Sequence, residues 1–379
     1  MSAWPEAPDH FAQFIIEEGG SAKDFAQRRR FGLYLDAILR DAVVFGDTVV
    51  IGAKAVAAQR SEDGWTIALE NGQTIAARVL VLAIGNQPPE PLAIASNAGP
   101  RFINNPWNED AKAAVRDAAA SCGDVLLVGT GLTMIDAVLS LRAAGHEGRI
   151  VALSRRGQIP RAHTDFAAAP VEQSEVPHGS VLALWRWLRR RSGTVGWRAA
   201  VDSLRPHSHA LWQSLDDPQQ RRFLRHARPW WDVHRHRIAP EVARQVHDRV
   251  AEGRLEIVAG RIGAIRDKDG GLEVAIKRRR GVRETRRFAY AINCTGPLGA
   301  IERTSDAMLR GLLDQGLVAP DHIGMGLEVD ERSRAGDRVW ALGPLAKGRY
   351  WEIVAVPDIR GQAAAVADDI VAELRELEA

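Results

Sequence analysis

Hydrophobic residues recur along this chain at two spacings, and the spacing separates predicted helices from predicted strands. Near the start of the chain, apolar residues three or four positions apart predict helices over His10–Glu18 and Phe31–Val43. Shorter apolar runs follow, with a turn at Glu70–Gln73 that is typical of a hairpin. We therefore predict a meander of three strands over Val49–Gln59, Gly64–Glu70 and Gln73–Ala77.

Two uninterrupted apolar runs predict strands that are covered on both faces. The first, Arg78–Ile84, ends at Gly85–Asn86. The second, Asp124–Val128, leads through a glycine turn into a helix over Thr133–Ala144 and a strand over Arg149–Ser154. The remaining predicted elements are a helix over Asp110–Ala120, a mostly helical stretch 163–250, strands over Leu255–Val258, Arg261–Arg266, Leu272–Lys277, Arg286–Asn293 and Arg338–Leu342, and a helix over Arg360–Leu377.

The glycine turn has the pattern of a dinucleotide-binding βαβ unit. Gly129 permits a tight turn, and Gly131 lets the backbone approach a pyrophosphate at the start of the following helix. Met134 stands where the third glycine of the fingerprint would be, so we expect looser packing of helix on strand there. The predicted nucleotide contacts of the turn are Gly129, Thr130, Gly131, Leu132 and Thr133.

The second strand of this unit ends in a serine and two arginines. NAD-binding units place an acidic residue there for the ribose hydroxyl, whereas Ser154, Arg155 and Arg156 suit a 2′-phosphate. This pattern favours NADP over NAD, with Ser154 and Arg155 as contacts. The alternative is a charged turn that only faces solvent.

Two other apolar strands close on small residues, one at Gly85 and Asn86 and the other at Thr295 and Gly296. Taken alone, each is a buried strand followed by a turn. Their positions on either side of the nucleotide unit favour contacts with a second cofactor.

Composition excludes several classes of protein. The formal net charge is +2 and charged residues make up 26% of the chain, so no overall basic field favours nucleic acid. The only two cysteines, Cys122 and Cys294, are far apart and form no redox pair. No apolar run is long enough to span a bilayer and no secretory leader is evident, so we expect a cytoplasmic protein without a membrane partner. Motifs of serine hydrolases and P-loop kinases are absent from the sequence.

The segment 221–237 interleaves arginine and histidine with two tryptophans. It could bind single-stranded nucleic acid, line a cleft for NADP phosphates or an anionic aromatic substrate, or form an amphipathic helix with a tryptophan core. We expect no nucleic-acid partner, given the balanced charge. His234 and His236 have no cysteine or carboxylate beside them in a ligand pattern, so no metal site is expected.

Taken together, the motifs resemble bacterial FAD/NAD(P)-binding oxidoreductases related to flavin-dependent N-hydroxylating and Baeyer–Villiger monooxygenases. The similar branch includes proteins labelled FAD-dependent urate hydroxylases. The resemblance extends over essentially the whole chain. It rests on Met1–Pro5, Pro8–Phe11, Ala83–Asn86, Val128–Met134, Trp230–Arg237, Ala291–Gly296, Trp340–Pro344, Trp351–Glu352 and Val356–Arg360.

This resemblance implies an α/β fold with two dinucleotide-binding, Rossmann-like domains, a small β-meander and a helical insertion. The expected parts are residues 1–117 and 290–379 for an interrupted FAD domain, and residues 118–289 for an NAD(P) domain with the insertion at 163–250. The sequence departs from the family in two places: the N-terminal G-x-G-x-x-G unit for FAD is missing before the first predicted helix, and Gly343–Pro344 replaces the usual Gly-Asp.

The implied function is a flavin-dependent NAD(P)H oxidoreductase, monooxygenase-like, in which hydride passes from NADPH to FAD before a small-molecule substrate is processed. The resemblance implies flavin contacts from Gly85, Asn86, Thr295, Gly296, Gly343, Pro344, Trp351 and Glu352, and we take His236 and Arg237 as candidate catalytic residues. The alternatives are a reductase without stable flavin and a non-catalytic dinucleotide-binding remnant. The substrate and the oligomeric state stay open.

Overall fold

The two apolar strands around the glycine turn lie next to each other in a seven-stranded sheet. The structure is a computed structural model and describes residues 2–22 and 25–378. The order of the strands in the sheet is β10-β9-β8-β7-β6-β11-β5, and the five strands from β8 to β5 are parallel. The strands are β5 (Phe102–Ile103), β6 (Val125–Val128), β7 (Ile150–Ser154), β8 (Leu255–Lys268), β9 (Gly271–Arg278), β10 (Arg283–Phe288) and β11 (Tyr290–Asn293).

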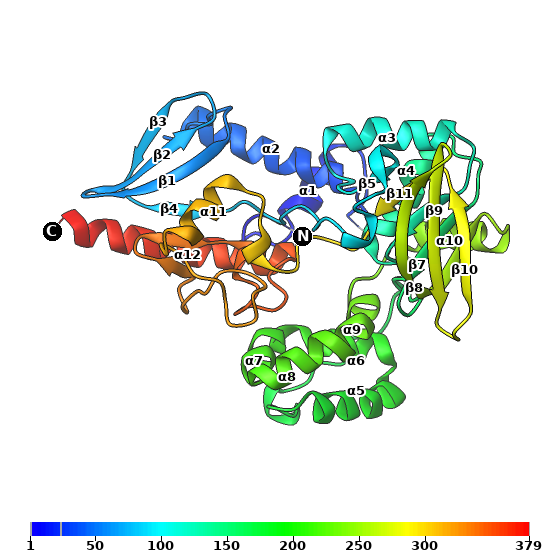
Figure 1. The fold of residues 1–379 in the computed structure, drawn as a ribbon. Helices are drawn as coiled ribbons and strands as arrows, with labels where there is room; N and C mark the ends of the chain where they lie inside the picture. The colour runs from blue at the N-terminus through cyan, green and yellow to red at the C-terminus, as the bar shows by residue number, and fades with distance from the viewer. Residues whose placement is uncertain (1, 23–24, 379) are drawn as a thin grey trace. The chain divides into compact units, whose positions relative to one another are not determined.

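Both faces of this sheet are covered, as the apolar run 124–128 predicts. The same prediction for the apolar run 78–84 is wrong, because Val81 in its middle is exposed. All four residues of β6 are buried. One face packs against helices α3 (Glu109–Ala120), α4 (Leu132–Ala143) and α10 (Pro240–Ala251), with Met134, Leu141 and Val246 in its core. A second buried core lies on the other face and includes Leu272 and Val274 of β9 and Phe288 of β10. Figure 1 shows α3, α4 and α10 beside these strands.

Two predicted strands near 255–266 form one strand, and the predicted strand 286–293 forms two. β8 pairs with β7 in parallel over its first residues and with β9 in antiparallel fashion after Gly260. The chain changes neighbours after Phe288, because β10 pairs with β9 whereas β11 pairs with β6 and β5. Both differences reflect hydrogen-bonding partners that local spacing does not encode.

The stretch between β7 and α10 is mostly helical, as predicted. Figure 1 shows its helices grouped apart from the strands of the sheet. A small core of Val171, Val176, Leu204 and Leu211 holds this group together. The elements are α5 (Val181–Val195), α6 (Trp197–Ser203), α7 (Ser208–Gln213), α8 (Asp217–Arg222), the π-helical turn η5 (Phe223–Ala227) and α9 (Arg228–Arg235).

The rest of the chain forms a second set of elements around its own core. The predicted meander is present as β1 (Ala55–Ser61), β2 (Gly64–Leu69) and β3 (Thr74–Ala77), all antiparallel. A second sheet has the order β12-β13-β4, with β4 parallel to β13. Its strands are β4 (Leu80–Leu82), β12 (Arg334–Gly336) and β13 (Val339–Ala341), and the helices nearby in sequence are α11 (Ala307–Asp314) and α12 (Val356–Glu378).

Helix α1 (His10–Glu17) packs on α2 (Arg28–Phe45) through an aromatic cluster of Phe11, Phe31 and Tyr34. Tyr34 is the one buried residue among the 18 of α2. The apolar side chains of the helix and of the segment after it are largely exposed, at Leu33, Leu35, Leu39, Val43, Val44, Phe45, Val49, Val50 and Ile51. The expected strand at Val49 therefore begins only at Ala55.

The chain divides into two compact units, Met1–Gln87 with Ala300–Ala379, and Pro88–Gly299. We call them unit 1 and unit 2. The expected divisions at 117/118 and 289/290 differ from these, because β5 and β11 belong to the seven-stranded sheet and α3 packs on it. Within the described residues, Cys122 is exposed, Cys294 is buried and both are free thiols. No described helix is long and apolar enough to cross a membrane.

Candidate functional site

The first glycine of the turn is required by a neighbouring strand end. Gly129 has φ +119°, and a Cβ atom there would lie 2.3 Å from the carbonyl oxygen of Cys294. Its missing side chain therefore lets the end of β6 approach the end of β11. A substituent at this position would clash with backbone, whether or not a nucleotide is bound.

The second glycine faces open space. Gly131 precedes α4 with ordinary backbone angles, and a Cβ atom added there would have no neighbour within 4 Å. Leu132 and Thr133 begin the helix, and their amides have no partner within it. This is the local geometry that a pyrophosphate needs. Met134, at the third fingerprint position, is fully buried, so its side chain fills the space that a glycine would leave.

Thr130 and Ser154 connect the turn to the end of β7. The Thr130 hydroxyl must donate to the carbonyl oxygen of Gln158, because a carbonyl only accepts. It then accepts from the Ser154 hydroxyl at 2.8 Å, and that hydroxyl in turn accepts from the amide of Gly157 at 3.0 Å. These bonds hold the two strand ends together, so Ser154 is engaged by the protein itself.

Arg155 and Arg156 differ in their surroundings. Arg156 is half-buried, and its Nη1 donates to the backbone carbonyl of His226 at 3.3 Å. Arg155 is exposed and forms no hydrogen bond or ion pair with any residue that the structure describes. Both border a cavity of about 180 Å³ whose other lining residues include Thr130, Gly131, Ser154 and Gln158. We call this cavity the nucleotide pocket; Arg155 is its available cation.

Helix α9 closes the other side of the nucleotide pocket. Pro229, Asp232 and Val233 line it. The helix is held there by main-chain bonds from the segment after β7: the amide of Arg161 donates to the Val233 carbonyl at 2.9 Å, and the amide of Ile238 donates to the Arg161 carbonyl at 3.0 Å. No signal in the sequence indicated Gln158, whereas Pro229 belongs to the segment 221–237, for which a cleft for NADP phosphates was one interpretation.

The two residues that we considered for catalysis lie at the end of α9. His236 is partly exposed, and its Nδ1 lies 3.9 Å from a carboxylate oxygen of Asp232. Arg237 is nearly buried, and one of its terminal nitrogens donates to both carboxylate oxygens of Asp202, at 2.6 and 2.5 Å. Its guanidinium also lies 5.1 Å from the ring centre of Phe166. Arg237 is thus bound within the protein, whereas His236 retains access to solvent.

Thr295 and Gly296 follow β11 in unit 2, at the same sheet edge as Gly129. The side chain of Asn293, fully buried, accepts from the amide and the hydroxyl of Thr295 at 3.1 and 2.7 Å. Gly296 has φ +94°, which explains the glycine. These two residues are therefore neighbours of the nucleotide turn within one unit.

The other predicted flavin contacts lie in unit 1, at the ends of a parallel strand pair. Gly85 follows β4 with φ +67°, and Gly343 follows β13 with φ +62°. A Cβ atom at Gly85 would meet nothing within 4 Å, and Asn86 beside it is exposed. The amide of Gly343 already donates to Gln362 at 2.7 Å, and Pro344 has no amide hydrogen to offer.

Trp351 and Glu352 are buried in unit 1, with 6% and 4% of their surfaces exposed. The Lys347 ammonium lies 5.2 Å from the ring centre of Trp351. Any contact that these residues make with a flavin ring would therefore involve their backbone or require a local opening. Trp351 and Glu352 lie in the same loop region as Gly343, but their side chains are buried in unit 1.

A second glycine pair in unit 1, Gly324 and Gly326, does not form a phosphate cradle. The carboxylate of Asp321 accepts from the amide of Ile323 at 2.7 Å, from that of Gly324 at 2.8 Å and from that of Gly326. Because the carboxylate already occupies these donors, they are not available to a pyrophosphate. Gly348 packs against the same carboxylate, since a Cβ atom there would lie 2.3 Å from its carbon.

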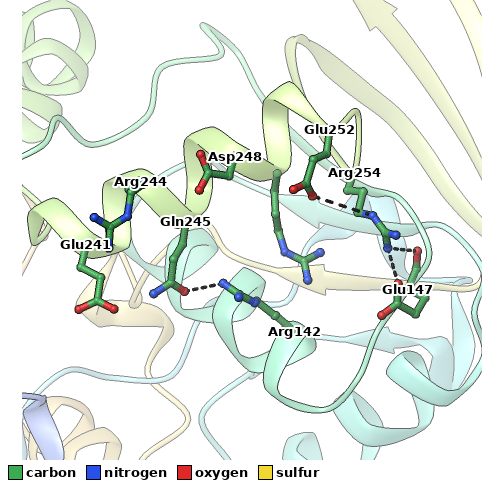
Figure 2. Close-up of a pocket in the computed structure, with 9 residues that line it drawn as sticks. Arg142, Glu147, Glu241, Arg244, Gln245, Asp248, Glu252 and Arg254 are labelled. Atoms are coloured by element: carbon green, nitrogen blue, oxygen red, sulfur yellow. Dashed lines mark hydrogen bonds and ion pairs between the residues drawn. The ribbon is translucent and has the colours of Figure 1, made fainter.

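The opposite end of α4 borders a larger cavity of about 690 Å³, lined by charged residues (Figure 2). Arg142 donates to Gln245 of α10 at 2.8 Å, and Arg254 pairs with Glu147. Four arginines face four carboxylates around it, so the cavity has no net charge: Arg142, Arg244, Arg249, Arg254, Glu147, Glu241, Asp248 and Glu252. Burial lowers the pKa of Arg249, and the neighbouring Arg142 and Arg254 lower it further. These contacts connect α4, α10 and the start of β8.

Comparison with known proteins agrees with this architecture. Residues 1–87 match a family model described as FAD-NAD(P)-binding. No curated protein sequence matches the chain. Among solved structures, L-lysine 6-monooxygenase from Pseudomonas syringae is similar with a TM-score of 0.63 at 16% identity, over 97% of this chain and 80% of that one.

Two further structures share the fold. Ornithine hydroxylase from Pseudomonas aeruginosa has a TM-score of 0.63 at 14% identity, over 98% of this chain and 83% of that one. Ornithine N-hydroxylase from Kutzneria sp. 744, with reduced FAD, NADP⁺ and L-ornithine, has a TM-score of 0.60 at 15% identity, over 96% and 82%. The chain therefore has the fold of two-dinucleotide-binding flavoproteins, as its sequence predicts.

Proposed function

We propose that this two-dinucleotide-binding chain is an FAD- and NADPH-dependent oxidoreductase of the monooxygenase type. The observation that carries the proposal is the nucleotide pocket of unit 2. There the open backbone at Gly131 and the start of α4 face the same cavity as Arg155, a cation without a partner among the described residues. An extended anion with phosphates at two points suits this arrangement.

The residues of the pocket fit NADP(H) in distinct roles. The α4 amides bind and orient the pyrophosphate, whose negative charge the helix start stabilises. Arg155 binds the 2′-phosphate, while Ser154 and Thr130 maintain the distance between the two strand ends. Pro229 and Val233 of α9 exclude water from one side of the pocket.

A bound flavin would accept hydride from NADPH, and the redox chemistry belongs to the cofactor. Unit 1 would contribute the ends of β4 and β13, where Gly85 and Gly343 let backbone lie close to a planar ring. The match of residues 1–87 to an FAD-NAD(P)-binding family supports this part, and so does the neighbour solved with reduced FAD and NADP⁺.

The neighbours named L-lysine 6-monooxygenase and ornithine hydroxylase support a small-molecule substrate for this chain. Of the two candidate catalytic residues, we propose that His236 faces reactants, because its side chain is 35% exposed. Arg237 acts as a positioning residue, since its pair with Asp202 joins α6 to the end of α9. We also propose a cytoplasmic location, where Cys122 and Cys294 stay reduced.

A second candidate is a nicotinamide-dependent reductase without stable flavin. The observation in its favour is the Gly324–Gly326 loop, whose amides are already bonded to Asp321. Titration of the chain with added FAD, followed by the flavin band at about 450 nm, separates the two, since only the first candidate binds FAD saturably. Anaerobic addition of NADPH should then bleach that band. Absence of NADPH binding by calorimetry would contradict both candidates.

A further inference from the structure

A cavity of about 500 Å³ lies within the helical group of unit 2, and four of the nine residues that line it are tryptophans. We call it the tryptophan pocket. Its defining residues are Trp185, Trp197, Trp230, Trp231, Arg189 and His234. The nucleotide pocket shares none of these residues. Sequence reasoning had singled out the two tryptophans of 221–237 but had missed Trp185 and Trp197.

Three helices each contribute one face to the tryptophan pocket. Trp185 and Arg189 are four residues apart on α5. Trp230 and His234 have the same spacing on α9, and Trp197 begins α6. Side chains four apart lie on one helix face, so these indoles converge because of the helix period.

The pocket has the size and lining of a small-molecule site. Small-ligand cavities are typically about 300–1,000 Å³ and mostly apolar, with a few polar groups. Trp230 remains 40% exposed, although an indole in water is unfavourable and a packed core would cover it. Ring faces at several orientations favour a flat aromatic ligand, which can stack on one indole and meet another edge-on.

The polar groups of the pocket favour a negative charge on that ligand. Arg189 is exposed and has no hydrogen bond or ion pair with any described residue. His234 lies edge-on to Trp197 at 4.9 Å, and its Nδ1 donates to the Trp230 carbonyl at 2.8 Å, so its Nε2 faces away from that bond. Among the described residues that line the pocket, none is a carboxylate.

Helix α9 separates the tryptophan pocket from the nucleotide pocket. Pro229, Asp232 and Val233 face the nucleotide pocket, whereas Trp230, Trp231 and His234 face the other. At about 100° per residue these two sets lie on opposite sides of the helix. The π-helical turn η5 leads directly into α9, and such turns are frequent at functional sites.

We propose that the tryptophan pocket binds a planar aromatic anion, and that its occupancy is linked to dinucleotide binding through α9. Binding of the aromatic anion requires only the tryptophan pocket. The linkage rests on the proposed function, because it needs NADPH in the nucleotide pocket. Any displacement of α9 by the aromatic ligand changes the position of Pro229 and Val233 and so the affinity for NADPH. NADPH must then change the affinity for the aromatic ligand by the same factor.

Titration of the full chain with 2-naphthoate, followed by tryptophan fluorescence and by calorimetry, tests the binding step. We expect saturable one-to-one binding. 2-Naphthylmethylamine, which has the same ring and a positive charge, and cyclohexanecarboxylate, which has no aromatic ring, should both bind much more weakly. Equal binding of all three probes, or binding of none, would overturn the proposal.

Variants locate the bound probe. Trp230→Leu should weaken 2-naphthoate about two- to tenfold through lost stacking, and Arg189→Gln should weaken it about two- to fivefold without changing the affinity for neutral 2-naphthalenemethanol. Trp107→Leu is the matched control, because Trp107 is also an exposed tryptophan of unit 2, at 54%, but lies outside the pocket. Equal loss in the Trp107 and Trp230 variants would place the probe elsewhere and overturn the assignment.

The linkage is measured as the NADPH affinity with and without saturating 2-naphthoate. We expect a change of at least about fivefold, the lower end of ordinary coupling. The change should disappear in Trp230→Leu. If both ligands bind and neither affects the other, the linkage is wrong. If 2-naphthoate binds but NADPH does not, the proposed function fails while the tryptophan pocket stands.

Discussion

Replacing Arg155 by alanine should separate NADPH from NADH in a way that no other substitution in the nucleotide pocket does. Arg155 is exposed at the end of β7 and has no partner among the described residues, so its removal leaves no buried group unsatisfied. The fold should therefore be unaffected, and the measured change reports on the ligand alone.

The size of the effect follows from the contact that is lost. A charge-assisted hydrogen bond between arginine and phosphate contributes about 1.5–3 kcal/mol. At about 1.4 kcal/mol per tenfold change, this corresponds to roughly a 10- to 150-fold weaker Kd for NADPH. Because Arg155 is exposed, water and salt screen the interaction, so we expect the lower part of this range and a smaller effect at high ionic strength.

Calorimetric titration with 2′,5′-ADP and with 5′-AMP measures the effect without a redox step. Arg155→Ala should lose affinity for 2′,5′-ADP and keep that for 5′-AMP. Arg156→Ala is the control: that side chain is bonded to the His226 carbonyl, so its loss should discriminate less between the two nucleotides. Equal losses for both nucleotides in Arg155→Ala would refute the assignment.

Three other predictions follow from the same structure. Gly131→Val should abolish NADPH binding but leave thermal unfolding almost unchanged, because a Cβ atom there meets nothing within 4 Å; normal nucleotide titration would contradict the pyrophosphate site. Asp369→Asn should lower the free energy of unfolding by roughly 2–3 kcal/mol at neutral pH, because Asp369 accepts from Arg334 at 2.7 Å and from Trp340 at 2.9 Å. The 379-residue chain should retain less than one FAD per molecule after gel filtration, because the amides of Gly324 and Gly326 already donate to the Asp321 carboxylate and cannot bind the FAD pyrophosphate. Purification as a stoichiometric FAD protein would show that other donors hold the pyrophosphate.

The Asp369 prediction includes a pH dependence. The hydrogen bond from Arg334 holds the pKa of the Asp369 carboxyl below its usual range. A depressed folded pKa contributes stability that is complete above the unfolded pKa, near about 3.9, and that is lost as the pH falls through the folded value. Chemical unfolding should thus show the difference between parent and Asp369→Asn shrinking below about pH 4. A difference that does not depend on pH would contradict this account.

The sequence alone specified the strand, glycine turn, helix and strand of the nucleotide unit almost residue by residue. Gly129, Gly131 and the apolar period around them act within one continuous segment, and β6, α4 and β7 form within a residue of their expected bounds. The helix before β6 and the second and third strands of the meander also form within a residue of their expected bounds, whereas the first strand begins at Ala55 and not at Val49. In these elements, each residue's own preference agrees with the packed structure.

The choice of strand partners was not determined locally. The run 286–293 is one apolar stretch in sequence, yet its two halves pair with β9 and with β6. As a result Thr295 and Gly296 lie beside the nucleotide turn in unit 2, whereas Gly85 belongs to unit 1. Hydrogen bonds between strands depend on which segments meet, and a single strand's spacing does not contain that information.

Tertiary structure also decided the roles of residues that look alike in the sequence. Arg155 and Arg156 are adjacent, but only Arg156 meets the His226 carbonyl from the helical group, so Arg155 has no partner among the described residues. Trp185 and Trp230 come from helices far apart in the chain and meet in one pocket. Helix and strand periods determined which faces were apolar; the neighbours that cover those faces come from distant segments, and their packing decides which side chains remain available for chemistry.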